Sequence, residues 1–166
     1  SAPALQGERL DLTQCTELRA FNSQFGSIKS IDASGLQNLE EFSCSEGHAE
    51  SVDVSNCSAL KKLNCDLNKI RELNLSGCTS LETLSCYSNE LTSLDISSCK
   101  NLTDLSCTRN HLTTETMSAL KADLYAKGYN CTVTPQIDEA GYLLLVDWSV
   151  LDDYADRGFV ANAGSW

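Results

Sequence analysis

Leu10-Asp11-Leu12-Thr13-Gln14-Cys15 is the first copy of a unit that recurs every 21 residues. The later copies occupy residues 31–36, 52–57, 73–78 and 94–99. Each begins with an apolar residue followed by Asp or Asn, and each has Ser or Thr at its fourth position. Five copies in register at a short, fixed period predict a solenoid whose coils pack on their neighbours, rather than a globule around one central core.

The second half of the repeat reads Leu-x-x-Leu-x-Cys-x-x-Asn-x-Leu, with its cleanest copies at residues 81–91 and 102–112. Apolar and polar residues alternate around Leu84 and Cys86, which is typical of a strand with one buried face. We therefore expect successive copies to stack as a parallel sheet.

A column of asparagines follows these strands at Asn68, Asn89 and Asn110. Their side-chain amides are placed to satisfy backbone groups where the chain turns. Gly26 and Gly47 occupy the same position in the first two coils and cannot make these bonds. We therefore expect looser packing in the N-terminal coils.

This pattern resembles the leucine-rich repeat, L-x-x-L-x-L-x-x-N/C-x-L. The 21-residue form with Cys at the third core position is similar to the bacterial cysteine-ladder type of internalin J-like and Bacteroidetes secreted or surface proteins. For residues 10–112 the resemblance implies an α/β repeat fold: a short, curved, right-handed solenoid with a parallel concave sheet and short strands or turns on the convex side. It also implies an extracellular or cell-surface location, with no signal or anchor segment in this chain.

The sequence flanking the five repeats divides into two parts that complete a single domain. Residues 1–9 are expected to form an N-terminal flank, in which Leu5 and Leu10 fold over the first coil; the alternatives are an exposed end or a continuation into further repeats. Residues 113–166 are expected to form a degenerate α/β capping unit. Its predicted elements are a helix from 113–115 to about 128, strands at 130–136 and 142–146, and a short helix at 150–156.

Eight of the nine cysteines follow the repeat rather than the pattern of a disulfide framework. Stacked coils lie about 4.8 Å apart, whereas a disulfide needs Cβ atoms about 3.8 Å apart. We expect reduced thiol ladders, with disulfide pairing and metal binding as the alternatives. Leu36 and Ser23 complete the two columns, and Cys131 lies outside them with its redox state open. The ladders are Cys15, Cys57, Cys78 and Cys99, and Cys44, Cys65, Cys86 and Cys107.

A column of aspartates, interrupted by Asn74, accompanies the first half of the repeats. Each carboxylate is expected to accept hydrogen bonds from the backbone and from the Ser or Thr two residues later. A calcium ladder is the alternative, but calcium needs six to eight oxygens in a cage and this column is a flat row. His48 and His111 are expected at the surface. The column is Asp11, Asp32, Asp53, Asn74 and Asp95.

Composition excludes several classes of function. The net charge of −11 argues against nucleic acid and anionic membranes as partners. No run of 18 apolar residues is present to span a bilayer. The sequence has no nucleophile elbow and no phosphate-binding loop. We therefore expect a protein without enzymatic activity, cofactor or bound metal.

The candidate ligand surface is the set of outward-facing strand positions and the adjacent rim. Tyr87 and Arg109 are the leading anchors, because interface hot spots are rich in aromatic residues and Arg. The sequence predicts a monomeric recognition module that binds a protein or glycan on this face. The alternative is a structural spacer or assembly segment that uses the N-terminal coil edge at Leu10–Leu12. The candidate binding residues are Glu41, Lys62, Asn64, Asp66, Ser85, Tyr87, Asp104, Ser106 and Arg109.

Overall fold

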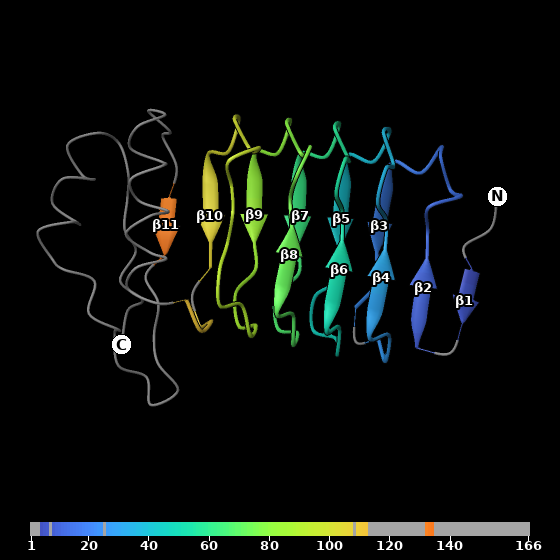
Figure 1. Cartoon of the computed structure of the whole chain (residues 1–166), viewed down its shortest axis with the longest axis horizontal. Helices are drawn as coiled ribbons and strands as arrows, with labels where there is room; N and C mark the ends of the chain where they lie inside the picture. The colour runs from blue at the N-terminus through green and yellow to red at the C-terminus, as the bar shows by residue number, and fades with distance from the viewer. Residues whose placement is uncertain (1–3, 7, 25, 108, 113–131, 135–166) are drawn as a thin grey trace, which may run out of the picture.

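The chain forms a parallel β-solenoid of about five turns, seen in a computed structural model (Figure 1). The structure describes residues 4–6, 8–24, 26–107, 109–112 and 132–134. Strands and turns account for these residues, and no helix occurs among them. The predicted solenoid of stacked 21-residue coils is therefore confirmed.

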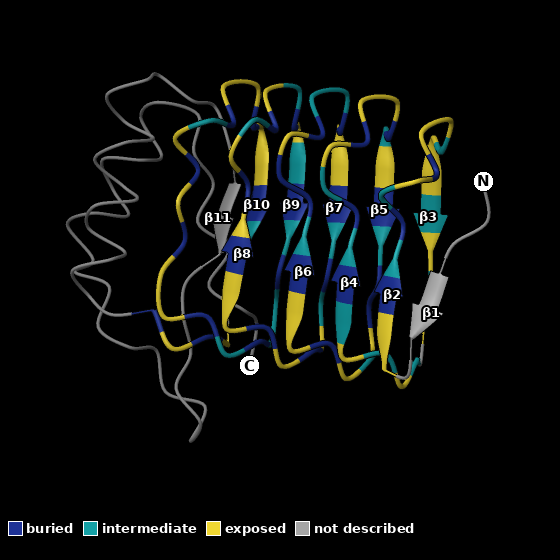
Figure 2. Cartoon of the chain, turned by 45° about the vertical axis from the view of Figure 1, so that its right-hand side comes forward, coloured by how far each residue is buried: buried dark blue, intermediate teal, exposed yellow. Residues whose placement is uncertain are grey.

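The Leu-x-x-Leu half of each coil contributes one strand to a six-stranded parallel sheet. The register keeps the 21-residue step, because Phe21 lies opposite Phe42, Leu63 opposite Leu84, and Leu84 opposite Leu105. β5, β7, β9 and β10 each bury their central apolar residue, and their flanking residues are exposed or partly exposed (Figure 2). The strands, in spatial order, are β3 (Ala20–Asn22), β5 (Glu41–Ser43), β7 (Lys62–Asn64), β9 (Thr83–Ser85), β10 (Asp104–Ser106) and β11 (Thr132–Thr134).

The other half of each coil forms a second, five-stranded sheet. Four of its strands are parallel, and β1 pairs with β2 in antiparallel register with Leu5 opposite Leu10. The N-terminal flank thus pairs with the first coil through β1. The strands are β1 (Ala4–Gln6), β2 (Arg9–Asp11), β4 (Ser30–Asp32), β6 (Ser51–Asp53) and β8 (Glu72–Asn74).

The core is a continuous column between the two sheets. The leucines at the strand centres, such as Leu63, Leu84 and Leu105, are buried at 0–1 % exposure. Because each coil covers the next, apolar burial accumulates along the stack and not at one centre. The core therefore fixes the strand register on which the outward side chains depend.

Most of the predicted capping unit lies outside the described residues. The predicted strand at 130–136 contains β11, which pairs in parallel with β10. The predicted helices, the strand at 142–146 and Cys131 all fall on residues that the structure does not describe.

The turns after β5, β7, β9 and β10 each place one residue in the left-handed region, with φ between 54° and 57°. Side chains other than glycine occupy this conformation at each described copy. One of them, Leu67, is a large apolar side chain that is 44 % exposed. The turn therefore presents a row of side chains at the rim of the sheet: Glu46, Leu67, Ser88 and Arg109.

Candidate functional site

The outward side chains of the six-stranded sheet form a polar surface, which we call the outer face. All nine predicted binding residues lie on it or at its rim. Four strands carry six of them, and the other three follow strand ends. On strands lie Glu41 of β5, Lys62 and Asn64 of β7, Ser85 of β9, and Asp104 and Ser106 of β10; after strands lie Asp66, Tyr87 and Arg109.

The Asp66 carboxylate organises the centre of this face. The Ser85 hydroxyl donates to both carboxylate oxygens, at 2.7 and 2.8 Å. The Tyr87 backbone N–H donates to Asp66 Oδ1 at 2.7 Å, and the Asp66 N–H donates to Asn64 Oδ1 at 3.0 Å. These bonds join adjacent coils and hold the chain at Tyr87 in place.

Burial raises the pKa of Asp66, while the hydrogen bonds from Ser85 and Tyr87 oppose this shift. Burial disfavours the charged carboxylate more than its donors stabilise it. Asp66 is therefore harder to ionise in the folded protein than in the unfolded chain.

We expect Asp66→Asn to be as stable as the wild type at pH 4 and increasingly more stable toward pH 7. A carboxyl group whose pKa is raised by folding contributes stability below its unfolded pKa and loses it as pH rises through the folded value. The amide oxygen of Asn can still accept from Tyr87 and Ser85. Urea unfolding of both proteins across this pH range measures the difference in their free energies of unfolding. The other carboxyl groups are common to both proteins, so their contributions cancel in this difference. A gap that stays constant with pH would contradict the prediction.

Tyr87 and Arg109 form the aromatic and cationic pair of the outer face. The Arg109 guanidinium lies over the Tyr87 ring, 5.6 Å from its centroid. Such a cation–π contact orients both groups before any ligand arrives. Arg109 is exposed and Tyr87 half-buried, so both remain accessible to a partner.

Lys62 is not an independent cationic anchor. Its Nζ lies 2.9 Å from Glu41 Oε1, and this hydrogen bond raises the pKa of Lys62. The two side chains neutralise each other on the exposed strands β5 and β7. No side-chain hydrogen bond or ion pair among the described residues joins Asp104 or Ser106 to Asp66, Tyr87 or Arg109, although Ser106 lies opposite Ser85 in the sheet. The structure thus joins seven of the predicted residues in two interacting clusters, and Asp104 and Ser106 lie on the neighbouring strand.

The asparagine ladder makes the bonds expected of it and connects neighbouring coils. Asn89 Nδ2 donates to the carbonyl oxygens of Cys65 and Cys86 at 2.9 and 3.1 Å, and its Oδ1 accepts from the Ile70 N–H at 3.0 Å. Asn68 and Asn110 repeat this arrangement one coil away on either side. These asparagines are buried structural groups and not ligand contacts.

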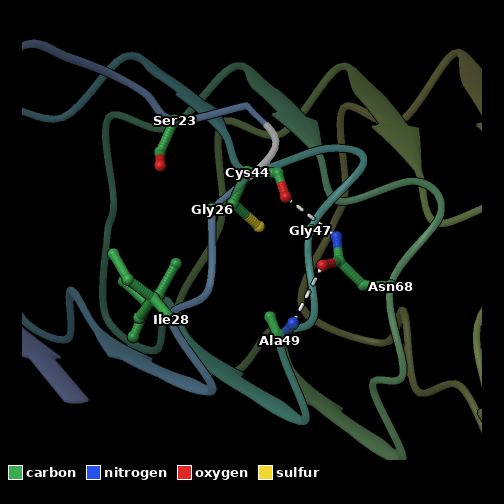
Figure 3. Close-up of a pocket in the computed structure, with 8 residues that line it drawn as sticks. Ser23, Gly26, Ile28, Cys44, Gly47, Ala49 and Asn68 are labelled. Atoms are coloured by element: carbon green, nitrogen blue, oxygen red, sulfur yellow. Dashed lines mark hydrogen bonds between the residues drawn. The ribbon is translucent and has the colours of Figure 1, made fainter. Parts of the chain in front are cut away.

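A small cavity lies where the ladder ends (Figure 3). The Asn68 amide donates to Cys44 O and accepts from the Ala49 N–H, both in the preceding coil. Gly47 occupies the asparagine position of that coil and has no side-chain amide to continue the ladder. The volume is about 10 Å³, roughly what one water requires. This cavity lies in the coils for which the glycines predict looser packing, and it is too small for a ligand. The lining residues are Ser23, Gly26, Ile28, Ile31, Cys44, Gly47, Ala49 and Asn68.

The two cysteine ladders are rows of buried thiols without disulfide bonds. In the first ladder the Cys57 and Cys78 thiols donate to carbonyl oxygens of the preceding coil, at 3.1 and 3.2 Å. In the second ladder Cys65 and Cys86 donate at 3.5 Å to carbonyl oxygens of the following coil. The thiols therefore pack as small apolar groups and also bridge coils.

Burial suppresses the reactivity of these thiols. It raises the pKa of Cys78 to about 12, and together with the Asp66 charge it raises the pKa of Cys44 to about 12. Burial also raises the pKa of Cys65 and Cys86 well above the ordinary value of a thiol. Because the thiolate is the reactive form, native ladder thiols should be inert.

In a Cys131→Ser variant, we expect maleimide labelling of the eight remaining thiols at pH 8 to be on the order of a hundredfold slower in the folded than in the denatured protein. Mass spectrometry over time counts the labelled thiols. The same variant in guanidinium is the control and should gain eight labels. Rapid labelling of two or more thiols in the native protein would contradict buried ladders.

The acidic column makes the local hydrogen bonds predicted for it. Asp11 accepts from the Thr13 N–H and hydroxyl at 2.9 and 2.7 Å, and Asp32 accepts from the same groups of Ser34. The Thr13 hydroxyl bond lowers the pKa of Asp11. Within the described ranges, no group of three or more His, Cys, Asp or Glu side chains is placed to hold a metal ion.

Sequence reasoning missed the charge ladders between coils. Glu40 pairs with Arg19 at 3.1 Å and with Lys61 at 3.2 Å, so one acid lies between two bases. These residues and the Glu41–Lys62 pair are separated by 21 positions. Oppositely charged residues 21 positions apart are therefore the sequence signal from which these charge ladders could have been predicted.

Comparisons with known proteins assign no relationship: no protein-family model matches the sequence, and no curated protein matches it significantly. The part of the chain that the structure describes has no helix long and apolar enough to cross a membrane.

Proposed function

We propose that the chain is a non-catalytic recognition module that binds a protein or glycan ligand at the outer face. The observation that carries this proposal is the Arg109 guanidinium over the Tyr87 ring, next to the Asp66 carboxylate that accepts from the Tyr87 backbone N–H. Binding sites for such ligands combine an aromatic surface with a few fixed polar groups. Here the ring supplies the apolar contact, and the guanidinium supplies directed hydrogen-bond donors.

The rigidity of the sheet supports a role in ligand recognition more than a role in catalysis. Each strand is hydrogen-bonded to its neighbours, so the side chains lose little freedom when a ligand arrives. The nearby serines and Asn64 offer hydrogen bonds over a polar surface. This suits a glycan or a polar peptide better than a large apolar partner.

We further propose that the chain belongs to the bacterial cysteine-ladder type of leucine-rich-repeat protein and acts outside the cell or at its surface. The support is the repeat at residues 81–91 and 102–112, together with two columns of buried thiols. The parallel sheets agree with this repeat at a coarse level.

The proposal is tested by measuring binding of the wild type and single variants to a glycan array and to purified candidate surface proteins. Tyr87→Ala and Arg109→Ala are each expected to weaken binding at least about tenfold without lowering the melting temperature, as is common for interface anchors. Arg109→Ala is a better test than Lys62→Glu, which would oppose Glu41.

Lys100→Ala is the matched control, because it removes an exposed cation outside the outer face. It should bind like the wild type. If a ligand binds the Tyr87 and Arg109 variants as tightly as the wild type, the outer-face proposal is wrong.

The alternative of a spacer that associates through Leu10–Leu12 has less support. Strand β1 pairs with β2 and thereby occupies the edge that such an association would use.

A further inference from the structure

The two sheets end differently at the N-terminal side of the solenoid. In the five-stranded sheet, β1 lies beyond the first coil and pairs with β2. In the six-stranded sheet, β3 is the terminal strand, and β5 is its one strand neighbour among the described residues. Among the described residues, the first coil is therefore extended only on the side of the five-stranded sheet (Figure 1).

The backbone of β3 can accept another strand. Arg19 O accepts from Glu41 N–H, and Ser23 N–H donates to Ser43 O, so odd-numbered residues bond to β5. In a parallel ladder the alternate residues bond to the opposite side. Ala20 and Asn22 therefore direct their backbone groups away from the sheet, and both residues are exposed.

The first coil also leaves part of the apolar column uncovered. Phe21 stacks on Phe42 with ring centroids 5.0 Å apart, but it is only half-buried, whereas Phe42 is 1 % exposed. Leu18 and Ile28 are likewise partly buried against the core. An added strand with an apolar side chain over Phe21 would continue the stack by one step.

The pattern of charges beside β3 indicates which residue the added strand should carry in addition to its apolar side chain. The ladder on this side alternates Arg19, Glu40 and Lys61. Arg19 is its terminal member, and 77 % of its side chain is exposed. Glu40 shows that one group in this column can pair on both sides. The next member beyond Arg19 should therefore be acidic.

We propose that β3 is a docking edge for an extended segment of a partner protein, in which an acidic residue lies two positions before an apolar residue. The segment adds a parallel strand beside β3, with its acid on Arg19 and its apolar side chain on Phe21. Backbone bonds supply affinity and the two side chains supply specificity.

A second copy of the chain fits this edge poorly. Strand β1 lies beyond the first coil on the side of the five-stranded sheet, so two first coils cannot meet closely through β3 on the other side. A single added strand has no such conflict, because it would lie level with β1.

The probe is a fluorescent peptide of residues 38–46 that carries Cys44→Ser, since this segment contains Glu40 two positions before Phe42. Fluorescence anisotropy with the full chain is expected to show saturable binding below about 1 mM. Asn22→Pro removes an outward N–H without removing a bond to β5, and should weaken binding at least about tenfold. Asn22→Ala keeps that N–H and should bind within about twofold of the wild type.

A charge exchange tests the register. Arg19→Glu should weaken binding of this peptide, and a peptide that also carries Glu40→Arg should recover it. Tyr87→Ala should leave peptide binding unchanged, which separates this edge from the outer face. Circular dichroism and melting temperatures confirm that each variant is folded.

Two results would overturn the proposal. One is no saturable binding, or equal binding by the wild type and Asn22→Pro. The other is self-association of the chain in sedimentation that Asn22→Pro abolishes, because the occupant would then be a second copy.

Discussion

Asn89→Ala is expected to lower the free energy of unfolding by about 3–5 kcal/mol, since each buried backbone group left without a partner costs about 1–3 kcal/mol. The side-chain amide accepts from the Ile70 N–H and donates to the carbonyl oxygens of Cys65 and Cys86. Asn89 is only 6 % exposed, so water cannot replace these bonds without opening the turn. The loss affects two adjacent coils at once.

Chemical unfolding followed by circular dichroism measures this effect. Asn101→Ala is the matched control, because Asn101 is exposed and its amide makes one 3.3 Å bond to Thr79 O. That variant should lie within about 0.5 kcal/mol of the wild type. Asn89→Asp keeps an acceptor for Ile70 but loses both donors, so it should also be strongly destabilised. Equal stability of Asn89→Ala and Asn101→Ala would show that the ladder does not hold the coils together.

The Asn68, Asn89 and Asn110 ladder was predictable because its bonds follow from position in the repeat. A period of 21 residues places equivalent atoms of successive coils about one strand spacing apart. Backbone groups at a fixed turn then need the same partner in every coil. Parallel pairing, the buried thiols and the acidic column followed from the same reasoning.

The contacts of the candidate site were less predictable because they differ from coil to coil. Asp66 meets Ser85 of the next coil, yet its equivalent one coil earlier is the buried Ser45 and not an acid. Whether Lys62 reaches Glu41 or a ligand depends on side-chain rotamers, which repeat spacing does not determine. The sequence therefore predicts which residues face outward, whereas their pairing requires the structure.

The open end at β3 also lay beyond sequence reasoning. The flank at residues 4–6 could have extended either sheet, and the pairing of Leu5 with Leu10 shows that it extends the five-stranded one. That choice leaves Arg19 and Phe21 at the edge. The repeat pattern, which treats all coils alike, contains no signal for it.

Phe42→Ala is expected to cost about 4 kcal/mol of unfolding free energy, within the range for large core aromatic residues. Phe42 occupies the position of Leu63 and Leu84, and it is buried against Phe21. The larger ring fits a coil in which Ala49 lines a cavity at the position of Ile70 and Leu91. Truncation would leave a second void in the coil that already contains the cavity at Ala49, and cavity volume itself destabilises.

Phe42→Leu distinguishes this explanation from a general need for an apolar residue. It restores the side chain of the other coils and should cost less than about 1.5 kcal/mol, because hydrophobic swaps of similar volume are tolerated. Thermal and urea unfolding of both variants give the comparison. If Phe42→Leu is as destabilising as Phe42→Ala, the Phe21–Phe42 stack contributes more than its volume. The N-terminal coils would then depend on aromatic contact where the ladder of asparagines ends.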